Sequence, residues 1–242
     1  MADSRAAKSF RAMHDRSGLD GPLVIPNVWD AGSAGVFAEA GFAALATSSG
    51  AVAEALGYQD GGFTPADEMF AAIARIVRSV DVPVTADIEA GYGLSPQEIV
   101  ERLLEAGAVG CNIEDSEPRT GEVKDAQEQA DRLAEIRAAA GDRIVLNARV
   151  DTFVHGDKSV ESAVRRARLY TEAGADVVYP ILAPVDLLPD IARVVSRPVN
   201  AMCLPGGPQP AELHRLGAAR VTFGTSLYRR AMAAVVGLAE EL

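Results

Sequence analysis

Polar side chains spaced two residues apart follow several apolar runs of the sequence. Three such pairs are Asp87 and Glu89, Asn112 and Glu114, and Asn147 and Arg149. Side chains two positions apart on a β-strand face the same way. The members of each pair are therefore predicted to project together. If the runs are neighbouring strands, three carboxylates meet one guanidinium.

The three carboxylates predict a divalent metal site. Like charges held close together are costly unless a cation lies among them. Oxygen donors with room for water suit Mg²⁺, with Mn²⁺ as the alternative ion. We therefore predict Asp87, Glu89 and Glu114 as metal-binding residues. The alternative interpretation is that these carboxylates only form ion pairs with Arg149 and neighbouring arginines.

Arg149 is the predicted anion-binding residue. A guanidinium can hold a substrate carboxylate or phosphonate through two parallel hydrogen bonds. Its alternative role is that of a structural partner for Glu114. A second anion site is predicted at Ser48, Ser49 and Gly50, where the backbone N–H groups of a small polar turn could surround a carboxylate.

Several other kinds of active site do not match the sequence. None of the lysines, Lys8, Lys124 and Lys158, lies at a predicted strand end, which disfavours a Schiff-base aldolase. The three histidines do not have the spacing of metal ligands. No G-x-S-x-G, P-loop or H-E-x-x-H motif is present. The chemistry is therefore predicted to rest on metal, carboxylates and arginine.

Short apolar runs alternate along the chain with helical stretches in which Ala, Glu and Arg recur three or four residues apart. The runs predicted as strands are residues 23–27, 43–48, 83–88, 110–115, 143–149, 176–181, 198–202 and 220–224. This alternation predicts a parallel α/β fold, and we favour a (β/α)8 TIM barrel, which brings the polar residues together at the carboxyl ends of its strands. The alternative is an open doubly wound sheet, but the G-x-G-x-x-G turn usual after its first strand is missing.

The length of 242 residues suits one barrel, so we predict a single domain over residues 1–242. An amphipathic helix at about residues 3–16, with Phe10 and Met13 on one side, is predicted to cover the bottom of the barrel. Cys111 and Cys203 have no C-x-x-C spacing and are predicted to be buried free thiols.

Charge and hydropathy limit the partners. The net charge of −11 argues against nucleic-acid binding, because phosphates would be repelled. The charged opening segment lacks the apolar core of a signal peptide, which predicts a cytoplasmic protein. The longest apolar stretch near the C-terminus, residues 231–239, is too short to cross a membrane.

Several blocks of the sequence, in order and with suitable spacing, resemble the isocitrate lyase and phosphoenolpyruvate mutase superfamily. The blocks are NVWDAGSA (27–34), GFAALATSSGAVAEALGYQD (41–60), PVTADIEAGYG (83–93), NIEDS (112–116) and NARVD (147–151). The resemblance implies a barrel fold, bound magnesium and a small α-oxo or α-hydroxy carboxylate as substrate. It also implies a dimer or tetramer whose subunits often exchange the eighth helix, here residues 225–242.

The resemblance implies a role for each matched residue. Asp87 resembles the direct metal ligand, while Glu89, Glu114 and Asp60 resemble the outer carboxylates that hold the waters of the ion. The implied substrate-binding residues are Ser48, Ser49, Gly50, Trp29, Asn112 and Arg149, and the implied catalytic residues are Arg149, Glu114 and Asp60.

The loop after the fourth predicted strand departs from the superfamily pattern. The lyases carry a K-K-C-G-H motif whose cysteine is the catalytic acid or base, whereas residues 116–123 read SEPRTGEV. Glu89 stands where the mutases have aspartate, and Pro180 stands near where they have a histidine. The candidates for the missing acid are Glu117, Arg119, Glu122 and His155.

These features predict a magnesium-dependent lyase or hydrolase. It would cleave a C–C bond of a small α-oxo or α-hydroxy dicarboxylate, of the 2-substituted malate or oxaloacetate type, through an enolate-like intermediate. One alternative is P–C bond chemistry on phosphonopyruvate or phosphoenolpyruvate, as a mutase or hydrolase. The other is a non-catalytic barrel that binds an oxo acid. The expected partners are a small carboxylate and further copies of the chain.

Overall fold

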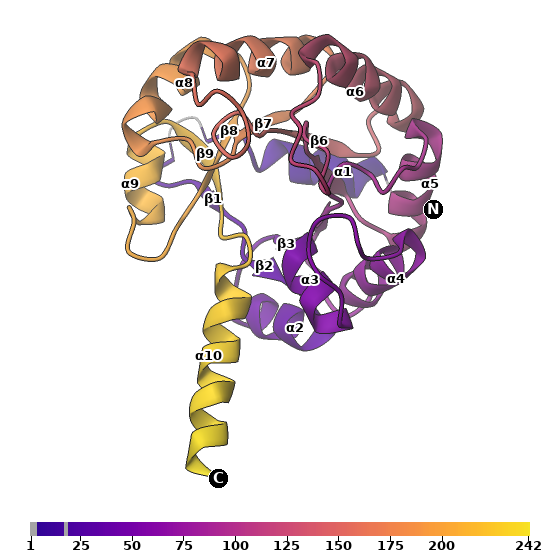
Figure 1. Ribbon diagram of the computed structural model, residues 1–242, viewed down its shortest axis with the longest axis vertical. Helices are drawn as coiled ribbons and strands as arrows, with labels where there is room; N and C mark the ends of the chain where they lie inside the picture. The colour runs from indigo at the N-terminus through magenta and orange to yellow at the C-terminus, as the bar shows by residue number, and fades with distance from the viewer. Residues whose placement is uncertain (1–3, 17–18) are drawn as a thin grey trace.

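Parallel strands form a ring with helices around it in the computed structural model, which describes residues 4–16 and 19–242 (Figure 1). The strands are β1 (Leu23–Val24), β2 (Asn27–Val28), β3 (Leu45–Thr47), β4 (Val84–Asp87), β5 (Gly110–Ile113), β6 (Val145–Val150), β7 (Val177–Pro180), β8 (Val199–Met202) and β9 (Ala218–Thr222). They follow the order β1-β9-β8-β7-β6-β5-β4-β3-β2. Only Ile25 and Pro26 separate β1 from β2, so one extended segment joins both ends of the sheet. The predicted (β/α)8 barrel is confirmed.

Helices alternate with the strands along the chain, and most of them lie on the outside of the ring. They are α1 (Ser4–Ala12), α2 (Ala31–Glu39), α3 (Ser49–Leu56), α4 (Ala66–Val77), α5 (Pro96–Ala106), α6 (Ala126–Ala140), α7 (Val160–Glu172), the short η1 (Val185–Leu187), α8 (Leu188–Val194), α9 (Pro210–Arg215) and α10 (Ser226–Glu241). Local sequence sets their ends. In α5, Ser95 and Glu98 form a capping box, Pro96 occupies the first turn and Gly107 ends the helix with a left-handed backbone.

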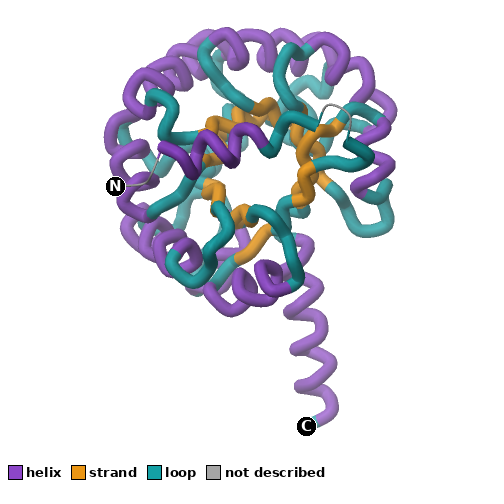
Figure 2. Tube along the Cα trace, turned by 180° about the vertical axis from the view of Figure 1, so that it is seen from behind, coloured by secondary structure: helices purple, strands orange, loops and turns teal. Residues whose placement is uncertain are grey.

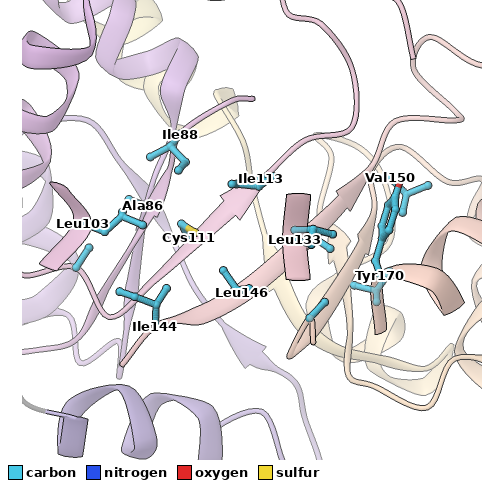
Figure 3. Close-up of a cluster of buried hydrophobic side chains, with 14 of the residues drawn as sticks. Ala86, Ile88, Leu103, Cys111, Ile113, Leu133, Ile144, Leu146, Val150 and Tyr170 are labelled. Carbon is cyan, nitrogen blue, oxygen red and sulfur yellow. The ribbon is translucent and has the colours of Figure 1, made fainter. Parts of the chain in front are cut away.

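Alternate strand residues face the helices and the barrel interior. Figure 3 shows Ala86 and Cys111 from neighbouring strands among the buried apolar side chains that include Leu103 and Leu133 of the outer helices. Cys111 is fully buried there, and burial raises its thiol pKa to about 12. Cys111 and Cys203 are free and buried, as predicted. The intervening residues, such as Asn112, are left to face the interior.

Helix α1 closes the bottom of the barrel, where the strands begin (Figure 2). Phe10 is fully buried and clusters with residues at or near the strand starts, including Leu23, Val145 and Val177. The covering role predicted for this segment is confirmed. The helix ends at Ala12, earlier than the predicted residue 16, and residue 3 lies outside the described residues.

Helix α10, the eighth of the barrel, points away from the ring (Figure 1). None of its residues is buried, and its exposed apolar side chains include Val235, Val236 and Leu238. Within residues 4–16 and 19–242, no helix combines the length and the apolar character that a membrane span requires.

His14 gives the barrel bottom a pH-dependent stability. It is 3% exposed, and its Nδ1 lies 2.9 Å from the carbonyl oxygen of Phe10. Burial, and then the nearby Arg220, lower the pKa of His14 from 6.5 to about 4. As the pH falls, His14 in the unfolded chain therefore binds a proton before His14 in the folded protein does. The contribution of His14 to the free energy of unfolding is complete above the pKa of the unfolded chain and is lost as the pH falls toward 4.

We expect the free energy of unfolding to fall by about 2 kcal/mol more in the native sequence than in His14→Gln between pH 7 and pH 5. Urea denaturation at the two pH values measures this difference. His155→Gln, which changes an exposed histidine, is the control and should keep the native pH dependence. An equal pH dependence in His14→Gln and the native sequence would contradict the assignment.

Candidate active site

The carboxyl ends of neighbouring strands bring four of the predicted polar residues together. Asp87 ends β4 and pairs in register with Asn112 of β5, which pairs with Asn147 of β6. Arg149 lies two residues further along β6. These positions agree with the predicted convergence of strand ends.

Ser48, Ser49 and Gly50 form the N-terminus of helix α3 rather than an isolated turn. Ser48 is the N-cap, and its Oγ accepts a hydrogen bond of 3.4 Å from the Ala51 N–H. The backbone N and the Oγ of Ser49 donate to Asp87 Oδ2 at 3.1 and 2.9 Å. A helix N-terminus favours negative charge. These two hydrogen bonds therefore fix Asp87 at the start of α3.

Gly50 is required because Asp60 lies directly against it. A Cβ added at Gly50 would come within 2.6 Å of Asp60 Oδ2 and 2.8 Å of Thr225 Cγ2. Asp60 also accepts a hydrogen bond of 3.0 Å from the Gly61 N–H. Burial, and then the charge of Asp87, raise the pKa of Asp60 above its ordinary value. The predicted catalytic carboxylate thus lies near Asp87 and the start of α3.

Arg149 is held between two carboxylates. Its NH1 lies 2.6 Å from Glu114 Oε2, and its Nε donates to Asp151 Oδ1 at 2.5 Å. Burial opposes the charge of Arg149, but Asp151, Glu114 and Asp87 outweigh it, so its pKa stays above the ordinary value. Burial raises the pKa of Glu114, and Arg149 opposes that rise. A guanidinium has five N–H donors, so further ones remain for an anion.

Glu89 does not lie on the strand, contrary to the predicted alternation. Strand β4 ends at Asp87, and the backbone of Glu89 is left-handed with φ 48°. Its side chain is 3% exposed, and neither carboxylate oxygen has a hydrogen-bond partner among the described residues. Burial, and then Asp87 and Asp60, raise its pKa to about 7. Nearby Tyr92 opposes this rise, although its hydroxyl does not reach full hydrogen-bond geometry.

The carboxylates divide into paired and unpaired groups. Glu114 and Asp151 pair with Arg149, whereas Asp60, Asp87 and Glu89 form no ion pair within the described part of the chain. The ion-pair interpretation therefore accounts for only part of the cluster. A cation would relieve the remaining repulsion.

A divalent ion fits these donors only with water as a further ligand. Within residues 4–16 and 19–242, no three His, Cys, Asp or Glu side chains are grouped closely enough to hold a metal ion by themselves. The two orphaned oxygens of Glu89 and the unpaired Asp87 suit an ion that keeps several waters, as Mg²⁺ does. The structure thus suits carboxylates that act through bound water.

A polar network supports the site from behind. Asp115 accepts hydrogen bonds from the Asp151 N–H at 2.7 Å, Arg166 NH1 at 3.0 Å and the Tyr170 hydroxyl at 2.6 Å. Ser116 Oγ donates to Asp151 Oδ2. Asp151, which orients Arg149, is therefore itself held in place. Arg166 and Tyr170 belong to α7, and only their helical spacing of four residues was visible in the sequence.

Arg220 lies inside the barrel and was missed at the sequence level. It is fully buried, and its NH2 lies 3.4 Å from Asn112 Oδ1. The same oxygen accepts a hydrogen bond of 2.6 Å from Asn147 Nδ2. Its Nε and NH1 have no partner among the described residues. Burial lowers the pKa of Arg220 to about 10. Asn112, a predicted substrate-binding residue, is thus tied to the polar interior.

The loop of residues 116–123 is held by a contact between its two ends and by contacts with neighbouring loops. Ser116 bridges Val123, and Arg119 donates from Nε and NH2 to the Gly62 carbonyl oxygen at 3.3 and 2.9 Å. A Cβ on Gly121 would come within 3.0 Å of His155 Nδ1. Two of the four acid candidates, Arg119 and His155, are therefore in contact with neighbouring loops.

Trp29 contacts a different element from the other predicted substrate-binding residues. Its ring meets that of Tyr228 edge to face, with centroids 5.3 Å apart. It lines a groove of 640 Å³ between α2 and the base of α10, together with Val36 and Leu227. These contacts connect Trp29 to the eighth helix.

Comparison with known proteins agrees with this geometry. A model of the phosphoenolpyruvate phosphomutase family matches residues 10–242. The chain belongs to this family. An uncharacterized protein of Mycobacterium tuberculosis is 33% identical over 221 residues, which is 90% of this chain and 83% of that protein.

Solved structures of family members have the same fold. A protein from Burkholderia cenocepacia J2315 superposes with a TM-score of 0.91 and 39% identity, covering 99% of this chain and all (100%) of that one. A 2,3-dimethylmalate lyase of the phosphoenolpyruvate mutase and isocitrate lyase superfamily has a TM-score of 0.85 and 28% identity, covering 98% and 87%. The family therefore includes proteins with lyase and mutase names.

Replacing Gly50 tests the contact between α3 and Asp60. In Gly50→Ala, the new Cβ must displace the Asp60 carboxylate, so we expect Mg²⁺ affinity to fall about ten-fold, as when other outer partners of a metal site are disturbed. Calorimetric titration with Mg²⁺ measures this. The matched control is Gly35→Ala on α2, where an added Cβ meets nothing within 4 Å. Equal Mg²⁺ affinity in the two variants would contradict the role given to Asp60.

Proposed function

We propose that this family member is a magnesium-dependent lyase or hydrolase that cleaves a C–C bond of a small α-oxo or α-hydroxy dicarboxylate. The observation that carries the proposal is the group of unpaired carboxylates, Asp60, Asp87 and Glu89, beside the partly buried Arg149 at the mouth of the barrel. The similarity to a 2,3-dimethylmalate lyase supports C–C cleavage. Substrates of the 2-substituted malate or oxaloacetate type suit this site.

The residues of the chain would first bind and orient the substrate. Arg149 would hold one carboxylate with the N–H groups that Glu114 and Asp151 leave free. The Gly50 N–H at the start of α3 would donate to the same group. Asp87, and through water Asp60, Glu89 and Glu114, would hold the ion, with Mn²⁺ as a substitute for Mg²⁺. A bound ion would stabilise negative charge on the oxo or hydroxyl oxygen as the bond breaks.

The loop of residues 116–123, or His155 beside it, would supply the proton that the departing carbanion takes up. Its lyase motif is replaced, so Glu117, Arg119, Glu122 and His155 stay candidates. Among them, His155 borders Gly121 of this loop, and Arg119 is already engaged with the Gly62 carbonyl. Cys111 is unsuited to this role because it is buried against the helices with a raised thiol pKa.

Phosphorus–carbon chemistry is the second candidate, favoured by the match to the phosphoenolpyruvate phosphomutase family. The same arginine and carboxylates would then bind phosphonopyruvate or phosphoenolpyruvate. Phosphorus NMR of phosphonopyruvate with the protein and Mg²⁺ separates the two reactions. If neither a panel of malates and oxaloacetate nor phosphonopyruvate is turned over while oxalate binds, the chain is a non-catalytic oxo-acid-binding barrel.

Separate loss of metal and anion binding tests the site. In Asp87→Ala we expect Mg²⁺ binding to fall at least about ten-fold, because a charged ligand is removed. In Arg149→Lys, which keeps a charge beside Glu114 and Asp151, we expect Mg²⁺ binding to persist and oxalate binding to weaken about ten-fold, because lysine cannot bond in a bidentate fork. Calorimetry with each ligand measures both effects.

The exposed residues Asp81 and Arg168 provide matched controls for these variants. Asp81→Ala and Arg168→Lys should bind Mg²⁺ and oxalate as the native protein does. Unchanged Mg²⁺ binding in Asp87→Ala, together with no turnover of any substrate in the panel, would overturn the proposal.

We also propose that the chain is a dimer or tetramer in which α10 packs on a neighbouring subunit. The helix buries none of its own residues, and Met232, Val235 and Leu238 are exposed by 37%, 49% and 60%. Apolar surface of this extent is usually covered by a partner. The groove at Trp29 and Val36 offers an apolar surface of the same kind.

Static light scattering tests the assembly. The native protein is expected to be a dimer or tetramer, and Leu238→Asp is expected to shift it toward monomer, because a charge would be buried in an apolar contact. Glu240→Gln on the same helix is the control and should leave the mass unchanged. A monomeric native protein would exclude the exchange of α10. A cytoplasmic location and the lack of nucleic-acid partners stay predictions from the sequence.

A further inference from the structure

A second polar cavity lies beside the candidate metal site. It has a volume of about 630 Å³ and lies between the turn after β4, the loop before α4 and the segment that leads into α6. Its ionisable lining residues are Glu89, Tyr92, Glu117, Arg119, Lys124 and Arg132. The volume is that of a small-molecule pocket. Glu89 joins this cavity to the unpaired carboxylates.

Five buried polar atoms that belong to the lining residues have no hydrogen-bond partner among the described residues. They are both carboxylate oxygens of Glu89, the Tyr92 hydroxyl, the Thr64 hydroxyl and the Nε of Arg132. Buried polar groups are nearly always paired, so this concentration in one cavity calls for a ligand or water that completes it. A polar ligand or ordered water is therefore indicated.

Lys124 contributes a half-buried charge that no carboxylate contacts as an ion pair, although the charges of Glu117, Glu114 and Asp115 act on it from beyond that distance. Its backbone N–H donates to the Asp115 carbonyl oxygen at 2.8 Å, which fixes the position of the residue. Its ammonium makes no ion pair or hydrogen bond with any residue that the structure describes. Burial, and then the charge of Arg132, lower the pKa of Lys124. Two cations thus face the same cavity close enough to repel each other.

Arg132 is fixed by the turn that carries Glu89. Its NH2 donates to the carbonyl oxygens of Ala90 and Leu94 at 3.2 and 3.1 Å. It forms no ion pair with a carboxylate within the described chain. Arg119 differs from these two cations, because it is held by the Gly62 carbonyl and lies over the Phe63 ring at 5.1 Å. The cationic end of the cavity is therefore Lys124 with Arg132.

We propose that Lys124 and Arg132 bind the second carboxylate of a dicarboxylate substrate. Two unpaired cations side by side are costly unless an anion lies between them. Glu89, one of the unpaired carboxylates, lines the same cavity as these two cations, so the cavity borders the candidate metal site. This inference rests on the proposed function, because it assumes that the first carboxylate is held at Arg149.

The arrangement makes Lys124 a specificity-determining residue. A ligand that ends in a methyl group would leave Lys124 and Arg132 unpaired, whereas one that ends in a carboxylate would satisfy both. A site built to bind a polar group rejects the analogue that lacks it. The protein should therefore prefer dicarboxylic over monocarboxylic oxo acids of the same length.

Matched ligands test the preference in the full chain. Calorimetry with Mg²⁺ compares oxaloacetate with 2-oxobutanoate and 2-oxoglutarate with 2-oxopentanoate, pairs that differ only in a terminal carboxylate or methyl group. We expect at least one dicarboxylate to bind about ten-fold more tightly than its partner, the range of a hydrogen bond to a charged group. In Lys124→Met this preference should largely disappear, with oxalate affinity unchanged.

The control is Lys8→Met, an exposed lysine on α1, which should keep the native preference. Folding of Lys124→Met is not in question, since the ammonium makes no bond, and its thermal midpoint should match that of the native protein. Arg132→Lys provides a second variant that keeps a charge and should lower the preference less.

The outcomes separate this inference from the proposed function. If oxalate binds and the native protein shows no preference for either dicarboxylate, or if Lys124→Met keeps the preference, the subsite is excluded and the metal and Arg149 site stands. If oxalate does not bind with Mg²⁺ and no oxo acid is turned over, the proposed function fails. A preference lost equally in Lys124→Met and Lys8→Met would also exclude the subsite.

Discussion

Unpaired negative charge at the mouth of the barrel is the constraint on which the site depends. The charge of Asp87 raises the pKa of Asp60 and of Glu89, Asp60 also raises that of Glu89, and none of the three forms an ion pair in the described chain. Such a group costs free energy in the protein alone. The surrounding structure holds it in place, through Ser49 on Asp87 and through Gly50, which leaves room for Asp60.

Backbone strain concentrates where the metal site and the second cavity meet. Glu89 and Tyr92 have φ values of 48° and 53°, and the glycines at 91 and 93 are also left-handed. A left-handed non-glycine residue costs on the order of 1–3 kcal/mol and persists only when its surroundings hold it. Arg132 provides this support by binding the carbonyl oxygens of Ala90 and Leu94. Arg132 therefore both holds the turn and places a positive charge in the cavity wall.

The barrel separates stability from chemistry along its axis. Phe10 and the apolar strand starts fill the bottom, while Asn112, Asn147 and Arg220 make the interior polar further up. Outside the strands, apolar side chains of the strands and the helices pack in the larger of the two buried apolar clusters (Figure 3). Because the apolar layers carry the fold, the mouth can hold orphaned polar groups that would be too costly elsewhere.

The sequence alone determined the barrel and predicted most residues of the candidate site. Alternating runs and glycine-ended helices predicted the eight-stranded fold, because these signals are local in the chain. Residues that end strands, such as Asp87 and Arg149, were found in the same way, because strand ends meet at one face of a barrel. The superfamily resemblance agreed with the family match over residues 10–242.

The tertiary structure decided which charges are paired and which are left free. Glu89 left the strand pattern because a left-handed backbone, which alternation cannot foresee, follows Asp87. The sequence did not predict that Lys124 lies near Arg132, because this depends on how the loop meets α6. In the sequence, Arg220 looks like an ordinary strand residue, and only the closed barrel shows that it is buried. Counter-ions are supplied by residues distant in sequence, so only the folded chain can show where one is missing.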